Sequence, residues 1–169
     1  TPDPPAAQAF YSKLGWKTQP WDQNPSYVMF VGPAGPLGAT VAWVGGAAHW
    51  VAYVGTTDIH QTVDKAKGLG ASVVKDITST GGGGDYAILK DPQGATFGVY
   101  ASSADPGPEG DPKRGEFSWH ELATSDHKAG LQFYSTLFDW EKLGEHDMGE
   151  MGTYILFGRN GRQLGGMMT

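Results

Sequence analysis

The stretch that decides the fold is Trp119-His120-Glu121-Leu122-Ala123-Thr124-Ser125-Asp126, together with the segment 130–140 that follows it. Within that segment, Phe133-Tyr134-Ser135 repeats Phe10-Tyr11-Ser12, which lies 123 positions earlier. Further on, Tyr154-Ile155-Leu156-Phe157 repeats Tyr27-Val28-Met29-Phe30, which lies 127 positions earlier. A repeat of this length indicates that the chain is built from copies of one structural module.

The composition predicts an ordinary globular protein. The 169 residues include no Cys, carry a net charge of −6 and are 39% hydrophobic. An acidic balance without a Lys/Arg cluster argues against nucleic acid and anionic membranes as partners. No apolar run approaches the roughly 20 residues of a membrane helix, and the absence of Cys excludes thiol catalysis within this sequence. The sequence therefore predicts a cytoplasmic protein that binds neither nucleic acid nor membranes.

Periodicity and turn residues divide the chain into three modules. In each, a helix begins at an Asp that can cap it, and strands of alternating residues follow. The order is β-α-β-β-β, with the opening strand missing from the first module. The predicted helices begin at Asp3, Asp58 and Asp126, and the predicted strands lie at 27–31, 37–44, 49–54, 71–74, 86–90, 95–100, 117–124, 154–157 and 164–169, with a further strand near 17–19.

Two segments are predicted to be irregular. Gly81-Gly82-Gly83-Gly84 is interpreted as a flexible hairpin loop, because it lacks the following helix and Lys-Ser/Thr of a phosphate cradle. The segment 101–116 is rich in Pro, Gly and charge and is typical of a linker.

The repeat register also makes a prediction about the ends of the chain. Thr1 aligns with Thr124, so this sequence is expected to be a fragment of a longer chain and to lack one strand in front and one module behind. Without that module, the half-module at the C-terminal end would leave an open sheet edge, which proteins normally cover. Pairing of two copies of the chain as a homodimer is the other way to cover it.

Three features together resemble the vicinal oxygen chelate superfamily, which contains the glyoxalases, the bleomycin-resistance proteins and the extradiol dioxygenases. They are the repeated modules, an Asp at the strand end before Phe-Tyr on the next helix, and the turn Asp91-Pro92-Gln93-Gly94 before a last strand. The stretch 119–126 is more closely similar to two-domain glyoxalase-like proteins of bacteria. The resemblance implies an α+β fold in which βαβββ modules pair into open barrel-like sheets with the helices outside. It divides the chain into a first glyoxalase-like domain at 1–100, a linker at 101–116 and the first module of a second such domain at 117–169.

In such a fold the two faces of each strand have different surroundings. Alternation places Trp119, Glu121 and Ala123 on the cavity side, and His120 and Leu122 on the helix side. On the second module the same register places these residues on the cavity side: His49, Val51, Tyr53, Thr96, Gly98 and Tyr100.

The resemblance also predicts where a metal ion would bind. Metal-using members carry His, Glu or Gln on the first and last strands of their modules, but here two of those places hold Val51 and Gly98, and the closing strands of the first and third modules offer no ligand. A divalent ion needs at least three protein donors, so we expect no metal site within this sequence. Ala123 occupies the place of the Arg that binds glutathione, which makes that cofactor unexpected too. A register shift of two, which would bring His49 into the Val51 place, is the alternative within the chain.

Glu121 is the candidate catalytic residue. A carboxylate facing an apolar cavity can orient an amine or hydroxyl of a ligand, or act as a general base. The structural alternative is a hydrogen bond to Tyr154 or to a backbone amide, or contact with solvent. The further substrate-binding candidates are Trp119, Tyr53, Tyr100 and His49; the aromatic ones would stack on a planar ligand, with packing in the core as the alternative.

Three functional hypotheses follow, and they leave open whether the protein is an enzyme. The first is a metal-free glyoxalase-like protein that binds a small organic molecule in an aromatic-lined cavity, as bleomycin-resistance proteins do, with any catalysis resting on Glu121. The second is a metal-dependent lyase, isomerase or dioxygenase whose ligands come from the missing strand, the missing module or a partner chain. The third is a degenerate copy that serves as an interaction or dimerisation module.

Overall fold

The chain forms two compact units. The computed structural model describes residues 1–33, 35–43, 47–104 and 110–169. The first unit comprises Thr1–Trp50 with Glu109–Ser118, and the second comprises Val51–Pro108 with Trp119–Thr169. The predicted division at 1–100, 101–116 and 117–169 cuts the chain at other places and stays a prediction. Part of the predicted linker, 105–109, lies outside the described residues.

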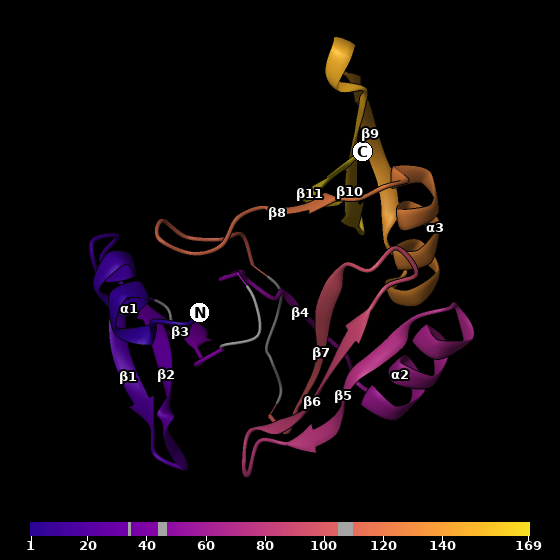
Figure 1. Cartoon of the computed structure of the whole chain (residues 1–169). Coiled ribbons are helices and arrows are strands. Elements are labelled where there is room, and N and C mark those ends of the chain that lie inside the picture. Colours follow the sequence, from indigo (N-terminus) through magenta and orange to yellow (C-terminus); the bar gives the residue numbers. More distant parts are fainter. Residues whose placement is uncertain (34, 44–46, 105–109) are drawn as a thin grey trace. The chain divides into compact units, whose positions relative to one another are not determined.

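Figure 1 labels the α-helices and the strands. The helices are α1 (Pro4–Ser12), α2 (Ile59–Gly68), α3 (His127–Phe138) and the short 3-10 helix η1 (Gly149–Met151). The strands are β1 (Lys17–Trp21), β2 (Asn24–Gly32), β3 (Gly35–Thr40), β4 (Tyr53–Gly55), β5 (Ser72–Ser79), β6 (Gly84–Lys90), β7 (Thr96–Ser102), β8 (His120–Ala123), β9 (Glu141–Asp147), β10 (Thr153–Arg159) and β11 (Arg162–Met168).

The helices α1, α2 and α3 each begin at an aspartate whose side chain accepts a hydrogen bond from the first turn. Asp3 accepts from the N–H of Ala6 at 2.9 Å, and Asp58 accepts from that of Gln61 at 2.9 Å. Asp126 accepts from two N–H groups at the start of α3, at 2.9 and 3.0 Å. These bonds satisfy donors that a helix leaves unpaired, so the predicted caps are confirmed. None of the helices in the described part of the chain is long and apolar enough to cross a lipid bilayer.

The first unit contains α1 and the antiparallel sheet β1-β2-β3. Its first residue shows that the repeat holds in three dimensions. The terminal amine of Thr1 donates to the carbonyl of Val41 at 3.2 Å, and the N–H of Trp43 donates to Thr1 at 2.8 Å. At the equivalent place in the third module, the N–H of Thr124 donates to the carbonyl of Met168 at 3.0 Å. The sequence repeat is thus a repeat of backbone hydrogen bonding.

Aromatic side chains form the core of the first unit. Tyr11 of α1 stacks on Trp16 with 5.4 Å between ring centroids, and both pack against Phe30, which is fully buried. The indole N–H of Trp50 donates to the hydroxyl of Tyr11 at 2.8 Å. The indole N–H of Trp16 donates to the carbonyl of Gly115 at 2.7 Å, so the end of the predicted linker packs within the first unit.

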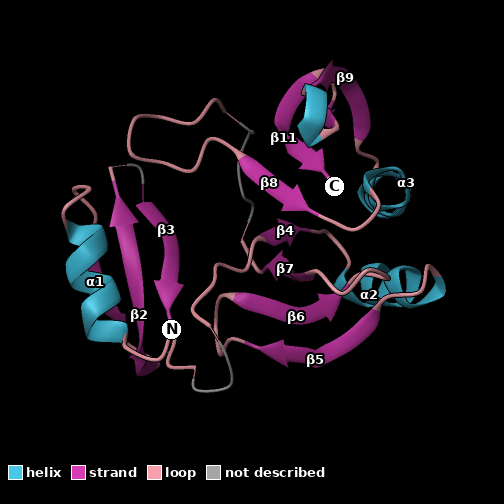
Figure 2. Cartoon of the chain, turned by 45° about the horizontal axis from the view of Figure 1, so that its top comes forward, coloured by secondary structure: helices cyan, strands magenta, loops and turns pink. Residues whose placement is uncertain are grey.

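The second unit holds two complete β-α-β-β-β modules, each with its own sheet. Figure 2 shows β4, β7, β6 and β5 side by side in the sheet of the second module. The sheet of the third module has the order β8-β11-β10-β9. In each sheet the opening strand lies parallel to the last strand, and the remaining neighbours are antiparallel. The predicted α+β class and module order are confirmed.

The apolar stripes of α2 and α3 and one face of the sheets share a single core. Its aromatic part joins Phe97 of β7 to Phe133 and Tyr134 of α3, with ring centroids 6.1 and 5.5 Å apart. This core therefore joins the two modules of the second unit. Its buried members are Ile59, Val63, Ala66, Ala71, Ala87, Leu89, Phe97, Val99, Phe133, Tyr134, Leu137, Phe138, Phe157 and Met167.

Several strands differ from the predicted ones. The strands predicted at 49–54 and 117–124 are shortened to β4 and β8, since Trp50 and Phe117 pack in the first unit. The strand predicted at 37–44 ends at Thr40, and residue 44 lies outside the described residues. The sequence did not specify β9, because its run Glu-Lys-Leu-Gly-Glu-His-Asp is mostly polar.

The glycine loop is tied down, where the sequence indicated a flexible loop. The hydroxyl of Tyr100 donates to the carbonyl of Gly83, and that of Thr80 donates to the carbonyl of Gly84 at 2.8 Å. The N–H of Ser103 also donates to Gly83 at 3.1 Å. Composition indicates backbone freedom, but it does not show which distant side chains use the exposed carbonyls.

Candidate functional site

The sheet of the third module has one face in the core and one open face. On the core side, the Leu122 side chain lies 3.7 Å from the point where a Cβ of Gly130 in α3 would stand, and Met167 is fully buried. On the other side, the ladder aligns Glu121 of β8 with Gly166 of β11. Successive residues of a strand point to opposite faces, so the predicted orientation of Glu121 away from the helices is confirmed.

Trp119 and Tyr154 meet on this open face. The indole N–H of Trp119 donates to the hydroxyl of Tyr154 at 2.9 Å. The Tyr154 ring lies across Gly166, where a Cβ would collide with its hydroxyl and ring carbons. The Trp119–Tyr154 pair therefore requires a residue without a side chain at position 166. Because Gly166 is aligned with Glu121, the pair lies beside Glu121.

Glu121 itself is exposed. The expectation of a carboxylate removed from water is not met, since Glu121 lies on an open face. Of the structural alternatives, contact with solvent is the one that the exposure of Glu121 supports. An exposed carboxylate beside an indole and a phenol can accept hydrogen bonds from a ligand that stacks on those rings.

The open face of the second module repeats this arrangement with a tyrosine in place of the glutamate. The ladder aligns Tyr53 of β4 with Gly98 of β7, and a Cβ on Gly98 would collide with the Tyr53 ring. Tyr53 is 48% exposed, and its ring centroid lies 6.3 Å from that of Tyr86 on β6. Tyr100 is aligned with Tyr86 in the next row. Three phenol rings thus share the face that the sequence predicted for Tyr53 and Tyr100.

His49 lies in a different unit from the other candidates. His49 belongs to the first unit, and Tyr53, Tyr100, Trp119 and Glu121 belong to the second. A ring nitrogen of His49 bonds with the carbonyl of Ala47, two residues away, at 2.9 Å. Whether any of these residues binds a substrate stays a prediction.

The described residues also show which side chains could hold a metal. Among residues 1–33, 35–43, 47–104 and 110–169, no three His, Asp or Glu side chains come together to hold an ion. On the second module the ladder position opposite Gly98 is Tyr53, which offers only a phenol. The donor set in this part of the chain does not fit a resident divalent ion, so no chemical step is assigned to one.

The sequence missed the role of the turn Asp91-Pro92-Gln93-Gly94 in joining the two modules of the second unit. The buried carboxylate of Asp91 accepts from the hydroxyl of Tyr134 at 3.0 Å and from the N–H groups of Gln93 and Ala95 at 2.9 Å each. Burial, followed by the neighbouring Asp91 charge, raises the pKa of Tyr134 well above its usual range. The phenol therefore stays protonated as a donor to Asp91.

The side chain of Gln93 completes this junction. Its oxygen accepts from the hydroxyls of Thr124 and Ser125 and from the N–H of Asp126, and its amide N–H donates to the carbonyl of Asp126. Both polar ends of Gln93 thus bind the loop that leads into α3. The sequence offered one usable signal, the repeated Phe-Tyr of the helix, but nothing in it paired that Tyr with Asp91.

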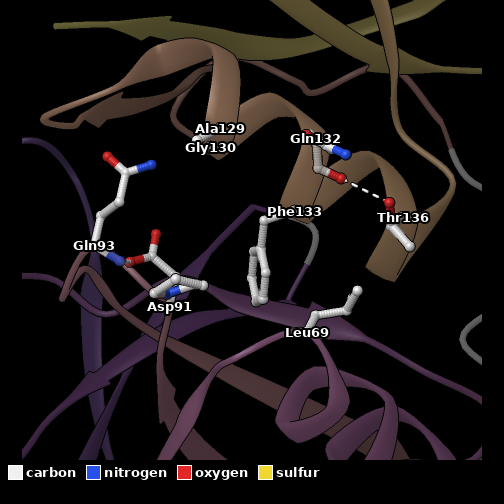
Figure 3. Close-up of a pocket in the computed structure, with 9 residues that line it drawn as sticks. Leu69, Asp91, Gln93, Ala129, Gly130, Gln132, Phe133 and Thr136 are labelled. Atoms are coloured by element: carbon white, nitrogen blue, oxygen red, sulfur yellow. Dashed lines mark hydrogen bonds between the residues drawn. The ribbon is translucent and has the colours of Figure 1, made fainter.

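A pocket of about 240 Å³ opens beside this junction. Figure 3 shows Asp91 and Gln93 on one side of it and residues of α3 on the other. The polar groups of Asp91 and Gln93 form hydrogen bonds with other residues of the protein. We therefore interpret the pocket as a gap in the packing between the two modules and not as a ligand site. Its lining residues are Leu69, Asp91, Pro92, Gln93, Ala129, Gly130, Gln132, Phe133 and Thr136.

Comparisons with known proteins agree with this architecture. Residues 1–100 match the family model of the glyoxalase-like domain. No curated protein matches the chain. The Mn(II)-bound glyoxalase from Novosphingobium aromaticivorans is similar in structure, with a TM-score of 0.69 at 16% identity, over 98% of this chain and 57% of that one. BphC, a halotolerant catechol dioxygenase, is similar with a TM-score of 0.62 at 13% identity, over 98% of this chain and 61% of that one. A glyoxylase/bleomycin resistance protein/dioxygenase domain from Frankia sp. is similar with a TM-score of 0.51 at 11% identity, over 75% of this chain and 92% of that one.

These likenesses establish fold and family. The chain spans about three fifths of the length of the first two of these structures. At such identities the structural neighbours show a shared fold, and fold does not determine the reaction. The family model covers more than half of the chain. The chain therefore belongs to the glyoxalase-like domain family of the vicinal oxygen chelate superfamily.

Proposed function

We propose that this protein binds a small planar organic molecule on the open sheet faces of its second unit, without a metal ion. The observation that carries the proposal is the pair of glycines, Gly98 and Gly166, each overlaid by a tyrosine ring on the face turned away from the core. An aromatic ring on a glycine floor presents a flat apolar surface with a polar edge, which suits a planar ligand.

Glu121 is the polar group that we assign to this ligand. It lies beside Gly166, and therefore beside the Trp119–Tyr154 pair, on the open face of β8. A ligand stacked on the indole would bring an amine or hydroxyl within reach of the carboxylate. Any catalysis would use Glu121 as a general base, because a carboxylate accepts protons and the described part of the chain gathers no metal-binding cluster.

We further propose that the protein uses no cofactor and binds neither nucleic acid nor membrane. The net charge of −6 and the absence of a Lys/Arg cluster in the sequence support the absence of nucleic acid and membrane partners. A homodimer and a cytoplasmic location stay predictions of the sequence.

The experiment combines metal analysis with ligand binding. The protein is incubated with nickel, cobalt, iron and zinc, desalted and analysed by mass spectrometry; we expect no stoichiometric metal. The metal-stripped protein is then titrated with planar aromatic fragments while the tryptophan fluorescence and the amide NMR signals of residues 119–123 are followed. Stoichiometric retention of one ion would contradict the proposal and favour the metal-dependent enzyme.

Glu121→Gln tests the assigned residue, and Glu150→Gln, at the exposed 3-10 helix η1, is its matched control. We expect weaker binding of amine- or hydroxyl-bearing fragments in Glu121→Gln alone. Equal binding in both variants would remove Glu121 from the site.

A further inference from the structure

The open face of the second module brings a lysine onto the same surface as its tyrosines. Across the sheet, the ladder aligns Lys75 with Ile88, Ile88 with Gly98, and Gly98 with Tyr53. Residues aligned in this way point to the same face of a sheet. The opposite face holds the buried core, so Lys75 and Tyr53 share the face that is accessible to a ligand.

Measured contacts link these side chains into one surface. The Tyr53 ring covers Gly98, and its centroid lies 6.3 Å from the Tyr86 centroid at an interplanar angle of 63°. The ammonium nitrogen of Lys75 lies 5.9 Å from the centroid of the Tyr86 ring. The surface therefore extends from the Tyr53 ring, which covers Gly98, across the Tyr86 ring to the ammonium group of Lys75.

The charge on this face differs from that of the whole protein. Alternation along β6 places Lys90 on the same face as Tyr86, and places the carboxylate of Asp85 on the opposite face. The chain as a whole carries a net charge of −6. A positive surface on an acidic protein concentrates anions locally, while the protein as a whole repels them.

We propose that this face binds a planar aromatic carboxylate. Its ring packs against Tyr53 and Tyr86, and its carboxylate accepts a charge-assisted hydrogen bond from the ammonium group of Lys75. The hydroxyl of Tyr100 donates to the carbonyl of Gly83, and Lys75 supplies the cation beside the Tyr86 ring. The proposal rests on the proposed function, since it requires the open face to bind ligands, and it adds the class of ligand.

Benzoate and benzamide test the proposal because they have the same shape and differ in charge. Both are titrated into the full chain while NMR follows the ring signals of Tyr53 and Tyr86. We expect benzoate to bind about fivefold more tightly than benzamide at low salt, which is the range of a single exposed ion pair. The preference should shrink as salt is added, because exposed charges are screened.

Two substitutions of Lys75 separate charge from shape. Lys75→Met should remove the preference for benzoate, and the net negative charge of the protein should then favour benzamide slightly. Lys75→Arg should retain the preference. The matched control is Lys13→Met, which removes the same charge from the first unit at the end of α1. It should leave the preference unchanged.

The outcomes distinguish this inference from the proposed function. If both probes shift the two tyrosines equally in the unmodified chain, the inference is wrong and ligand binding by the face stands. If neither probe shifts them, the face does not bind planar ligands and both proposals fail there. A benzoate preference that survives Lys75→Met would place the anion elsewhere and would also overturn the inference.

Discussion

The first and third modules form the same aromatic core from repeated residues, but their helices differ in how far they are exposed. Tyr11 stacks on Trp16 with 5.4 Å between ring centroids, and Tyr134 stacks on Trp140 with 5.6 Å. In each module the phenylalanine of the repeated strand packs against that tryptophan. The interior of a module is thus a local property, because the residues that form it lie within one repeat.

The outer face of the helix differs between the two modules. Phe10 of α1 is 58% exposed, whereas Phe133, its counterpart in α3, is 6% exposed. The tyrosine hydroxyls differ as well: that of Tyr11 accepts from a tryptophan, while that of Tyr134 donates to the buried Asp91. The repeated phenylalanine is therefore buried in α3, where the second module packs against the helix, and exposed in α1.

The largest difference is expected when the repeated phenylalanine is removed. Phe133→Ala should lower the free energy of unfolding by about 3–5 kcal/mol, because a buried ring is replaced by a cavity. Phe10→Ala should cost about 0.5 kcal/mol or less, since the side chain is mostly exposed. Urea unfolding followed by circular dichroism measures both, and equal losses would mean that α1 is as well packed as α3.

The repeat also offers a reciprocal test of the glycine under Tyr154. Gly166→Ala should cost about 1–3 kcal/mol through overpacking and should separate Tyr154 from Trp119. The residue 127 positions earlier is Ala39. Ala39→Gly should cost only about 0.5–1 kcal/mol, from backbone entropy. A change of tryptophan fluorescence in Gly166→Ala reports the loss of the pair. Unchanged fluorescence there would show that Tyr154 adapts without leaving the indole.

Removing the tyrosine hydroxyls should have a smaller effect. Tyr134→Phe should destabilise the protein by about 1–2 kcal/mol, because the buried carboxylate of Asp91 loses a donor. Tyr11→Phe should cost about 0.5 kcal/mol or less, since its partner Trp50 is 46% exposed and can bond to water. Thermal unfolding of the two variants compares them. A larger loss for Tyr11→Phe would reverse the assignment of Tyr134 as the joint between modules.

The smallest effect is expected at the cap of α3. Hydrogen bonds from the N–H groups of Ala129 and Lys128 lower the pKa of Asp126. A group whose pKa is lower in the folded state stabilises the protein above its unfolded pKa of about 3.9, and that contribution is lost as the pH falls through the folded pKa. Asp126→Asn keeps a capping side chain that does not titrate. Its stability should therefore fall less between about pH 5 and pH 2 than that of the unmodified protein.

Unfolding midpoints at a series of pH values give this comparison. Asp64 and Glu145, whose pKa values are lowered by hydrogen bonds from Lys67 and Lys142, should still titrate in both proteins and give the common part of the acid loss. Identical acid profiles would show that the cap of α3 contributes no pH dependence.

Part of the candidate site followed from alternation alone. Glu121 and Leu122 are neighbours in sequence and point to opposite faces, as a strand requires. The parts that did not follow depend on distant partners. The register of β5, β6 and β7 places Tyr86 and Lys75 on the same face as Tyr53. The pairing of β5 with β6 contains irregularities that no local sequence pattern specifies. The grouping of His49 with these residues stays a prediction, because the chain between it and Tyr53 passes from one unit to the other.

The sequence by itself determined the module, its order of elements, the three aspartate caps and the family, because each depends on residues within one turn, one strand or one repeat. Only the tertiary structure decided which copy of the repeated helix is covered, that Tyr134 bonds with Asp91, and which charges lie beside the tyrosines. These features join residues tens of positions apart, and they are stable only where burial and hydrogen bonding together outweigh the entropy of bringing such residues into contact.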